Sequence, residues 1–259
     1  MLEVSGVTKR FGGLVAVSSV DLSVQPGEIV SLIGPNGAGK TTLFANIAGF
    51  QKPDEGKIEF KSTSIAGMKP HRICALGMVR TFQITQPFAG LNTLENIMIG
   101  AYANTSNSAI ARENAERVAE TVGMTSQLYQ SAEGLTVAGR KRLELARALA
   151  TNPDLLLLDE VMAGLNPTEI DDIVTVIKSI RDAGVTIFLI EHVMKAVMKL
   201  SDRTYVLNDG KLIAQGTPKS VAGDPMVIEA YLGHGAAKTM VGGRKKWFQF
   251  ALYRLDTAW

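Results

Sequence analysis

The sequence predicts an α/β fold with a parallel-sheet core, and three patterns support this prediction. Alternating apolar and polar residues fill positions 1–33, and Gly12-Gly13 and Pro26-Gly27 interrupt them, which is typical of several short strands. The compact apolar run Ile29–Ile33 ends abruptly in a glycine-rich loop, and a helix is expected to follow over about residues 40–48. A strand, a loop and a helix in this order form the repeating unit of α/β folds.

The rest of the chain predicts further strands and one inserted helical subdomain. Residues 53–66 are typical of a strand pair, with a turn signal at Pro53–Gly56. Helical periodicity replaces the strand pattern over about residues 84–137, with expected helices at Asn96–Ala103 and Ala111–Val122. The core is then expected to resume with a helix over 138–150, a strand over 155–159, a helix near 168–183, a strand over Val185–Ile190, and a strand pair around Arg203–Ala214 that turns at Asn208–Gly210.

The bulk composition indicates a cytosolic chain whose membrane role, if it has one, comes through a partner. Its 259 residues, 46% of them hydrophobic, can bury a sizeable core. The 27 basic and 25 acidic residues give a net charge of +2, which disfavours nucleic-acid binding through a strong positive field. The single cysteine, Cys74, permits no intramolecular disulfide and favours a reducing compartment. The N-terminus lacks the regions of a signal peptide, and the apolar run Leu155–Leu158 is far shorter than the roughly 18 residues of a membrane helix.

The glycine-rich loop carries a phosphate-binding motif. The residues that fit G-x-x-x-x-G-K-[ST] at every fixed position are Gly34, Pro35, Asn36, Gly37, Ala38, Gly39, Lys40 and Thr41, with Thr42 directly after them. Glycines let the backbone wrap an anion with its N–H groups inward, and the following helix points its positive end at the same phosphates. Lys40 is expected to bind the β- and γ-phosphates and Thr41 to place its hydroxyl on Mg²⁺. The alternative, a turn that fits the motif by chance, is disfavoured by the strand before it and the helix after it.

Two carboxylates follow the apolar run Leu155–Leu158, namely Asp159 and Glu160. Ligands bind at the carboxyl ends of strands in open parallel sheets, so these acids are expected to face the phosphate loop. Asp159 is expected to hold Mg²⁺, through water, and Glu160 to act as general base toward the attacking water. The alternative is a pair of solvated acids at a strand end, and a phosphate loop in the same chain disfavours it.

With these motifs in place, residues 2–234 resemble the ATP-binding-cassette (ABC) ATPases, and most closely the subunits of bacterial importers for branched-chain amino acids. The stretches that carry the resemblance are Phe11–Leu14, Val79–Gln83, Leu91–Asn96, Glu160–Pro167, Ile190–Met194, and Gly223–Pro225 with Tyr231–Gly233. The resemblance implies an ABC ATPase domain over residues 1–235. Its fold is an α/β P-loop NTPase core with an N-terminal antiparallel β subdomain and an inserted α-helical subdomain.

The resemblance also implies roles for three further side chains at the nucleotide. Phe11 would stack on the adenine ring of ATP, and the alternative is an ordinary core phenylalanine. Gln83 would reach Mg²⁺ and the attacking water, and would begin the segment that contacts the membrane partner. His192, just beyond an apolar strand, would bind the γ-phosphate and orient the water together with Glu160. The alternative for His192 is a satisfied surface histidine.

One stretch departs from the family's pattern. The family's hallmark is Leu-Ser-Gly-Gly-Gln at the start of a helix, where it clamps the γ-phosphate bound to the other subunit of a dimer. The equivalent residues of this chain are Leu135, Thr136, Val137, Ala138 and Gly139. The methyl group of Ala138 and the missing amide side chain at Gly139 suggest the hypothesis of two unequal sites in a heterodimer. The alternative is a variant clamp that works normally.

A second departure lies in the loop expected to cross the dimer interface, which comprises Gly164, Leu165 and Asn166. Related ATPases usually carry Asp at the position of Asn166. The lost charge suggests the hypothesis of looser communication between the two ATP sites.

The resemblance predicts an ATPase that drives uptake of branched-chain amino acids or related small solutes. Its expected partners are a second ABC ATPase subunit, in a homo- or heterodimer, integral membrane permease subunits and, indirectly, an extracytoplasmic solute-binding protein, with no nucleic acid. The protein would lie peripherally at the cytoplasmic face of the inner membrane. The alternatives are the ATPase of a lipid or polysaccharide exporter, a soluble ABC ATPase without a transport role, and a small-molecule kinase.

The tail 236–259 falls outside the resemblance. It is aromatic, with both tryptophans of the chain, and carries the basic cluster Arg244–Lys246. If helical, it would place Phe248 and Trp259 on one apolar face suited to a membrane interface or a partner. A disordered extension is the equal alternative, so its role stays open.

Overall fold

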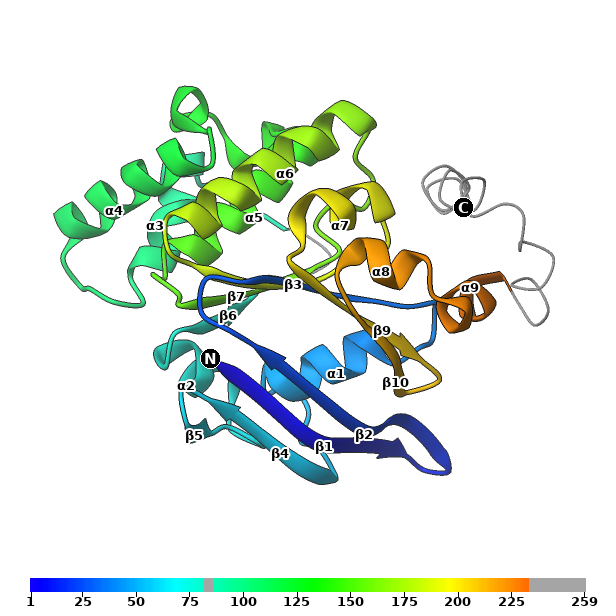
Figure 1. Cartoon of the computed structure of the whole chain (residues 1–259). Coiled ribbons are helices and arrows are strands. Elements are labelled where there is room, and N and C mark those ends of the chain that lie inside the picture. The colour runs from blue at the N-terminus through cyan, green and yellow to red at the C-terminus, as the bar shows by residue number, and fades with distance from the viewer. Residues whose placement is uncertain (82–85, 233–259) are drawn as a thin grey trace. The chain divides into compact units, whose positions relative to one another are not determined.

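The computed structural model describes residues 1–81 and 86–232 (Figure 1). Contacts between residues divide them into two compact units. Among the described residues, the first unit comprises residues 1–70 and 188–232, and the second comprises residues 71–81 and 86–187. Gln83 and the tail 236–259 lie outside the described residues. Within the described ranges, no helix is long and apolar enough to span a membrane.

An antiparallel sheet forms the N-terminal part of the first unit. Its strands are β1 (Leu2–Phe11), β2 (Leu14–Val24), β4 (Glu55–Phe60) and β5 (Thr63–Ser64), in the order β2-β1-β4-β5. The β1–β2 hairpin turns at Gly12-Gly13, as the sequence predicts. This sheet is the predicted antiparallel β subdomain.

The predicted position of the second turn is wrong. The β4–β5 pair turns at Lys61 and Ser62, whose φ angles of 49° and 62° form a tight two-residue loop, and not at Pro53–Gly56. Gly56 lies inside β4 because the β1 backbone approaches it closely. A Cβ at this position would lie 2.5 Å from the Gly6 carbonyl carbon.

A mostly parallel set of strands completes the first unit, in the order β10-β9-β3-β8. The strands are β3 (Ile29–Ile33), β8 (Thr186–Ile190), β9 (Arg203–Asn208) and β10 (Lys211–Gly216). Strands β3 and β9 are parallel, and every residue of β3 is buried, which explains its unbroken apolar sequence. Helix α1 (Lys40–Ile47) follows β3, and its Phe44 ring lies 4.8 Å from that of Phe188 in β8.

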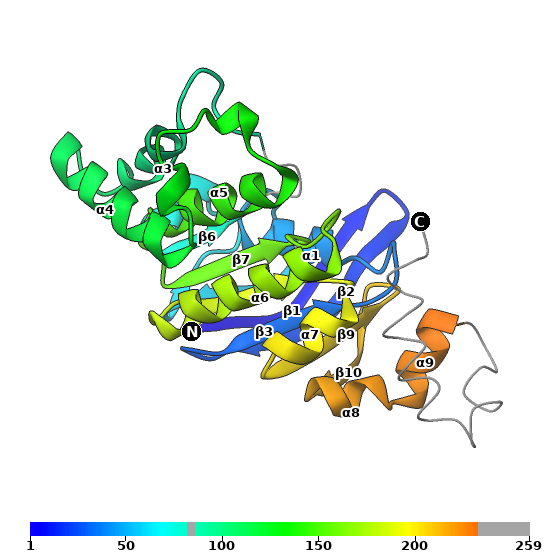
Figure 2. The same ribbon diagram turned by 90° about the horizontal axis from the view of Figure 1, so that it is seen from above.

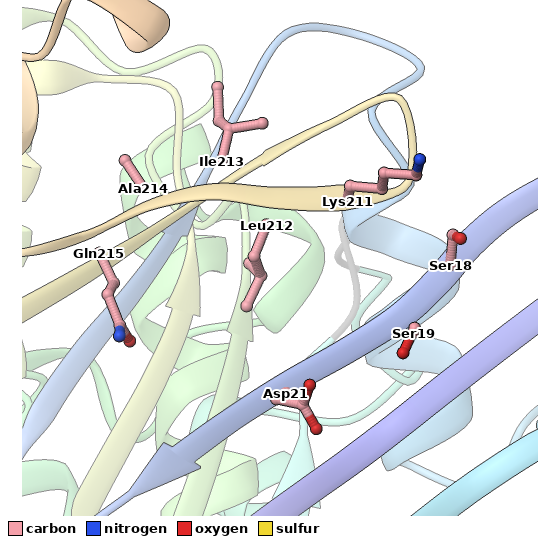
Figure 3. A pocket seen from close by; sticks show the side chains of 8 residues that line it. All are labelled: Ser18, Ser19, Asp21, Lys211, Leu212, Ile213, Ala214 and Gln215. Atoms are coloured by element: carbon pink, nitrogen blue, oxygen red, sulfur yellow. The ribbon is translucent and has the colours of Figure 1, made fainter.

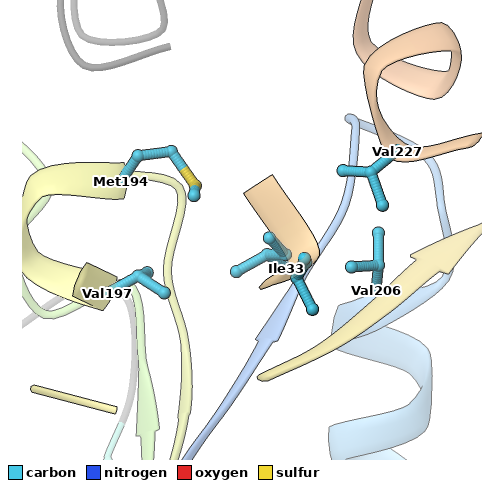
Figure 4. Packing of buried hydrophobic residues seen from close by; sticks show 6 residues of the cluster. Ile33, Met194, Val197, Val206 and Val227 are labelled. Atoms are coloured by element: carbon cyan, nitrogen blue, oxygen red, sulfur yellow. The ribbon is translucent and has the colours of Figure 1, made fainter. Parts of the chain in front are cut away.

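Three short helices pack on the C-terminal strands of the first unit: α7 (Met194–Leu200), α8 (Pro218–Ala222) and α9 (Pro225–Leu232). Their apolar residues join Ile33 of β3 and Val206 of β9 in one buried cluster (Figure 4). Each helix has eight residues or fewer, too few to establish a helical period, so the sequence pattern did not predict them.

The second unit combines a short parallel strand pair with helices. Strands β6 (Met78–Arg80) and β7 (Leu155–Asp159) pair in parallel, and every residue of β7 is buried. The helices are α2 (Pro70–Ala75), α3 (Thr93–Ala101), α4 (Ser108–Thr121), α5 (Val137–Leu149) and α6 (Pro167–Asp182), with 3₁₀ turns at Thr125–Gln127 and Ala132–Gly134. Helices α3 and α4, which lie within the predicted helical insertion, pack together, and both also contact α5, which the sequence assigns to the core (Figure 2).

The two helices predicted for this insertion begin three residues earlier than the apolar periodicity predicts. Asn92 caps α3 by accepting a hydrogen bond from the Glu95 N–H, and the Glu95 carboxylate accepts one from the Asn92 N–H. Asn107 caps α4 in a similar way, with its side chain bound to the Ala109 N–H. The polar caps, which carry no apolar signal, therefore set these helix starts.

We expect the substitution Gly56→Ala to lower the free energy of unfolding by about 2–5 kcal/mol, because the new Cβ overlaps the Gly6 backbone at a left-handed φ of 89°. Gly12→Ala is the matched control: its φ is 57° but nothing lies within 4 Å of the added Cβ, so the loss should be about 1 kcal/mol. Urea unfolding followed by circular dichroism measures both. Equal losses would contradict the close approach of β1 and β4.

Candidate functional site

The phosphate loop joins β3 to α1, and its backbone is packed tightly at both ends. A Cβ on Gly34 would overlap the carbonyl oxygen of Leu207, and a Cβ on Gly39 would overlap that of Ala16. Gly39 is also the N-cap of α1, with a φ of 100° and no side-chain capping bond. The first N–H groups of α1 therefore have no side-chain cap, which is the arrangement that binds anions.

The β9–β10 turn is hydrogen-bonded to the phosphate loop through backbone groups. The Gly210 N–H donates to the Ala38 carbonyl at 3.0 Å, and the Ser18 N–H of β2 donates to the Gly210 carbonyl at 2.8 Å. Backbone hydrogen bonds thus join β2, the turn and the phosphate loop in series. The middle of the loop is open: Asn36 and Gly37 are exposed, and nothing lies within 4 Å of a Cβ added at Gly37.

Lys40, in the first turn of α1, folds back onto the loop. Its residue is only 7% exposed, and its Nζ donates to the carbonyls of Gly34 at 2.7 Å and Pro35 at 3.0 Å. These neutral carbonyls accept two hydrogen bonds from the buried ammonium. Thr41 is exposed and Thr42 is half-buried beside it. The loop thus combines backbone donors, a hydroxyl and a positive charge.

Two other predicted residues of the first unit lie at strand ends. Phe11, at the end of β1, is 46% exposed, so the alternative of an ordinary core phenylalanine is wrong. Lys9 Nζ lies 5.5 Å from the centroid of its ring. His192 is partly buried and lies two residues after the end of β8.

The C-terminal helix α9 also reaches the phosphate loop. Tyr231 packs against the cluster that contains Ile33, the residue before Gly34. Burial raises the pKa of the Tyr231 phenol, and the nearby Gly34 N–H opposes this rise. Among the described residues, however, no group lies in hydrogen-bonding geometry to the buried Tyr231 hydroxyl. The sequence placed Tyr231 in a stretch shared with a family but gave no signal for this position.

The acidic strand end lies in the second unit. Asp159 closes β7 with its side chain 5% exposed, so it is not the solvated acid of the alternative interpretation. Its Oδ2 accepts a hydrogen bond at 2.6 Å from Arg80 at the end of β6. Glu160, which follows, has a φ of 49°. A left-handed glutamate is strained, and such strain is concentrated at functional sites.

The variant signature residues begin helix α5. Thr136 is the N-cap, and its Oγ1 accepts a hydrogen bond from the Gly139 N–H at 3.1 Å. Thr136 and Val137 are exposed, Ala138 is half-buried, and Leu135 is buried. Gly139 packs tightly, because an added Cβ would lie 3.3 Å from the Leu135 Cβ. The signature therefore forms a capped helix start whose first two residues, Thr136 and Val137, are exposed.

The predicted interface loop begins helix α6 in a similar way. Asn166 is the N-cap, and its Oδ1 accepts from the N–H groups of Thr168 and Glu169, each at 3.0 Å. The Glu169 carboxylate accepts from the Asn166 N–H at 2.9 Å, which completes a capping box. Gly164 and Leu165 precede it, and the φ of Gly164 is 78°. Asn166 thus has a local structural role that aspartate would fill equally well.

A groove of about 640 Å³ lies between β2 and β10 (Figure 3). The residues that line it are Ser18, Ser19, Asp21, Lys211, Leu212, Ile213, Ala214 and Gln215. None of the residues predicted for nucleotide binding is among them. The groove is therefore separate from the candidate site.

The two units each contain part of the predicted site. The first unit contains the phosphate loop, Phe11 and His192, and the second contains Asp159, Glu160, the signature start of α5 and the cap of α6. The prediction for Gln83 falls outside the described residues. Sequence reasoning missed Arg80 and Tyr231 as neighbours of site residues.

Comparison with known proteins shows the family to which the chain belongs. A model of the ABC transporter family matches residues 17–163, and a model of the branched-chain amino acid ATP-binding cassette transporters matches residues 211–237, which include β10, α8 and α9. The high-affinity branched-chain amino acid transport ATP-binding protein BraF of Pseudomonas aeruginosa is 42% identical, with 90% of this chain and 98% of the relative covered. LivG of Escherichia coli K12, described in the same words, is 40% identical with the same coverage.

The solved structures with a similar fold are ATP-binding cassettes as well. A nucleotide-free ATP-binding cassette from an ABC transporter has a TM-score of 0.82 and 32% identity, and covers 90% of this chain and 99% of its own. An ATP-binding cassette in its ADP conformation has a TM-score of 0.83 and 33% identity, with the same coverage. From its fold, its phosphate loop and these similarities, we conclude that the chain belongs to the ABC transporter family, among the branched-chain amino acid transport ATP-binding proteins.

Proposed function

We propose that this chain is the ATP-hydrolysing subunit of an importer for branched-chain amino acids or related small solutes. The observation that carries the proposal is the phosphate loop: an uncapped helix start, two glycines with no room for a side chain, and the buried Lys40 ammonium. The named relatives favour this role over that of an exporter ATPase or a soluble ABC ATPase. The experiment that tests it is ATP binding and turnover by the Lys40 variant described below.

ATP binds through contacts that the loop already prepares. The N–H groups at the start of α1 bind the phosphate oxygens, and the helix dipole favours their negative charge. The Lys40 ammonium exchanges the carbonyls of Gly34 and Pro35 for the β- and γ-phosphate oxygens. The exposed ring of Phe11 stacks on the adenine.

The residues at hand fit a magnesium ion. Magnesium in phosphoryl-transfer sites uses one or two carboxylates, the substrate phosphates and several waters, so a cage of three acidic or histidine side chains is not needed. The exposed hydroxyl of Thr41 and the carboxylate of Asp159 supply suitable oxygens, and we assign Gln83 to the same ion. When bound, Mg²⁺ neutralises charge on the phosphates.

Hydrolysis requires a base beside the γ-phosphate, and we assign that role to Glu160. Its carboxylate accepts a proton from water while the water oxygen bonds to the γ-phosphorus, and the bond to the bridging oxygen breaks to release ADP. His192 and Gln83 orient the water and the γ-phosphate. The left-handed backbone of Glu160 supports this assignment, since it sets the direction of the side chain as it leaves β7.

Two copies of such a cassette close around ATP. The exposed start of α5, at Thr136 and Val137, contacts the nucleotide of the second subunit, and the loop Gly164–Asn166 lies at the interface. ATP binds the closed dimer more tightly than the open one, so ATP binding shifts the population toward the closed dimer. This shift drives the conformational change of the membrane partner. The second cassette is the same chain or a related one.

The membrane permease subunits dock near the segment that follows Gln83, at the cytoplasmic face of the membrane. Phe88 is 48% exposed, and the guanidinium of Arg147 in α5 lies 5.3 Å from its ring centroid. Arg147 also donates to the Gln86 carbonyl at 3.1 Å. Phe88 is therefore exposed to a partner and also contacts α5, the helix that begins with the signature residues. A change at the ATP site could reach the permease contact through this helix. An extracytoplasmic binding protein and the permease choose the solute.

We expect Lys40→Ala to weaken ATP binding about 10–100-fold and to abolish turnover, because a charged hydrogen bond contributes about 1.5–3 kcal/mol. Fluorescence of a labelled ATP measures binding, and phosphate release measures turnover. Lys211→Ala, an exposed lysine of the separate groove, is the control and should leave both unchanged. Full activity of Lys40→Ala would refute the phosphate-loop assignment.

Glu160→Gln should keep ATP binding, trap the closed dimer and slow hydrolysis about 10²-fold or more, because the amide cannot accept the proton of the water. Single-turnover hydrolysis and size-exclusion chromatography with ATP provide the measurements. Glu113→Gln on the exposed face of α4 controls for the loss of one acid. Unaltered hydrolysis would remove Glu160 from the role of base.

Ala138→Gly tests whether the methyl group weakens the clamp on the partner's nucleotide. A weakened clamp predicts faster ATP turnover in the variant, although glycine costs about 1 kcal/mol of helix stability. Ala109→Gly occupies the matching second position of α4 and reports the stability effect alone. An unchanged rate would favour a variant clamp that works normally.

A further inference from the structure

Arg80 and Asp159 form an ion pair that is almost completely buried. The Arg80 Nη2 lies 2.6 Å from the Asp159 Oδ2, and the two side chains are 10% and 5% exposed. A buried ion pair seldom adds net stability, because removing both charges from water costs about as much as their attraction returns. Stability alone therefore does not explain why charged residues occupy these two strand ends.

The strand register places the two groups together. In the parallel β6–β7 ladder, Arg80 is the partner of Leu157. Leu157 and Asp159 point to the same face of the sheet because they are two residues apart, so Arg80 reaches Asp159 along the diagonal. The contact thus follows from the backbone of the two strands as well as from the choice of side-chain rotamers.

Thr81 fixes this register at the point where the pair forms. Its N–H donates to the Leu157 carbonyl at 2.9 Å, and its Oγ1 accepts from the Asp159 N–H at 3.3 Å. The backbone on both sides of the ion pair is therefore held by hydrogen bonds. These hydrogen bonds hold the main chain of Asp159 next to Arg80.

A carboxylate has two oxygens and about four positions that accept hydrogen bonds. Arg80 bonds to one of these oxygens, which limits the rotation of the carboxylate about its side-chain axis. Neighbours that bind a metal ligand in this way orient it, and their loss typically costs about 10–100-fold in metal affinity. Arg80 stands in this relation to Asp159.

We propose that Arg80 is a positioning residue for the magnesium site, which holds the Asp159 carboxylate in the orientation that a divalent cation requires. The proposal rests on the role of Asp159 toward Mg²⁺ proposed above. Arg80 is not a catalytic residue, since it acts through Asp159. Its effect should appear in the dependence of ATP binding on Mg²⁺.

The test compares the affinity for a fluorescent ATP analogue in MgCl₂ and in EDTA. In the wild-type protein Mg²⁺ should strengthen binding, and in Arg80→Met this gain should fall about 10-fold while the affinity in EDTA stays unchanged. Arg80→Lys keeps the positive charge and should restore part of the gain. Arg142→Met, which removes a more exposed ion pair with Asp172, is the matched control and should retain the full gain.

The outcomes separate this proposal from the one on which it rests. If Mg²⁺ does not strengthen ATP binding to the wild-type protein, the assignment of the metal site itself fails. If it does and Arg80→Met and Arg80→Lys both keep the full gain, Arg80 is only structural and the inference is overturned. A larger gain in Arg80→Met would also overturn it, since the arginine would then act only by repelling the cation. In an Asp159→Asn background, Arg80→Met should cause no further loss.

Discussion

The candidate site depends on close backbone packing against the phosphate loop. The carbonyls of Leu207 and Ala16 leave no room for a side chain at Gly34 and Gly39. Leu207 belongs to β9 and Ala16 to β2, so strands from two different sheets define the ends of the loop. The local motif therefore acquires its shape only when distant parts of the first unit have folded. The ends of the loop are therefore closely packed, whereas its middle is open at Gly37.

Two buried charges of the site are satisfied in different ways, and the difference suits their roles. Lys40 donates to the neutral carbonyls of Gly34 and Pro35, which it can exchange for phosphate oxygens. Asp159 is bound to the charged side chain of Arg80. Breaking that pair would leave a buried ion uncompensated, so the carboxylate should stay in place. A mobile cation and a fixed anion are what a site needs that must admit a phosphate yet hold a metal.

The parts of the fold that were predicted correctly are those determined by residues close together in the chain. The buried strands β3 and β7, the phosphate motif and the Asp209-Gly210 turn of the last hairpin all follow from residues close together in the chain. The turn predicted at Pro53–Gly56 was wrong because Gly56 is required by the β1 backbone, which is remote in sequence. Helices α7 to α9 are too short for a period, and tertiary packing on the Ile33 cluster stabilises them instead.

The same distinction separates the site residues that sequence could predict from those it could not. Arg80 and Asp159 are 79 residues apart, and only the register of two strands brings them together. Thr136 and Asn166 were expected at a dimer interface, and each also caps the helix that it begins. Because Asn and Asp cap helices equally well, Asn166 in place of the family's usual Asp keeps the start of α6 intact. The difference from the family at this position therefore lies in the charge and in the two N–H donors of the amide, and any effect on communication between subunits has to arise from one of these.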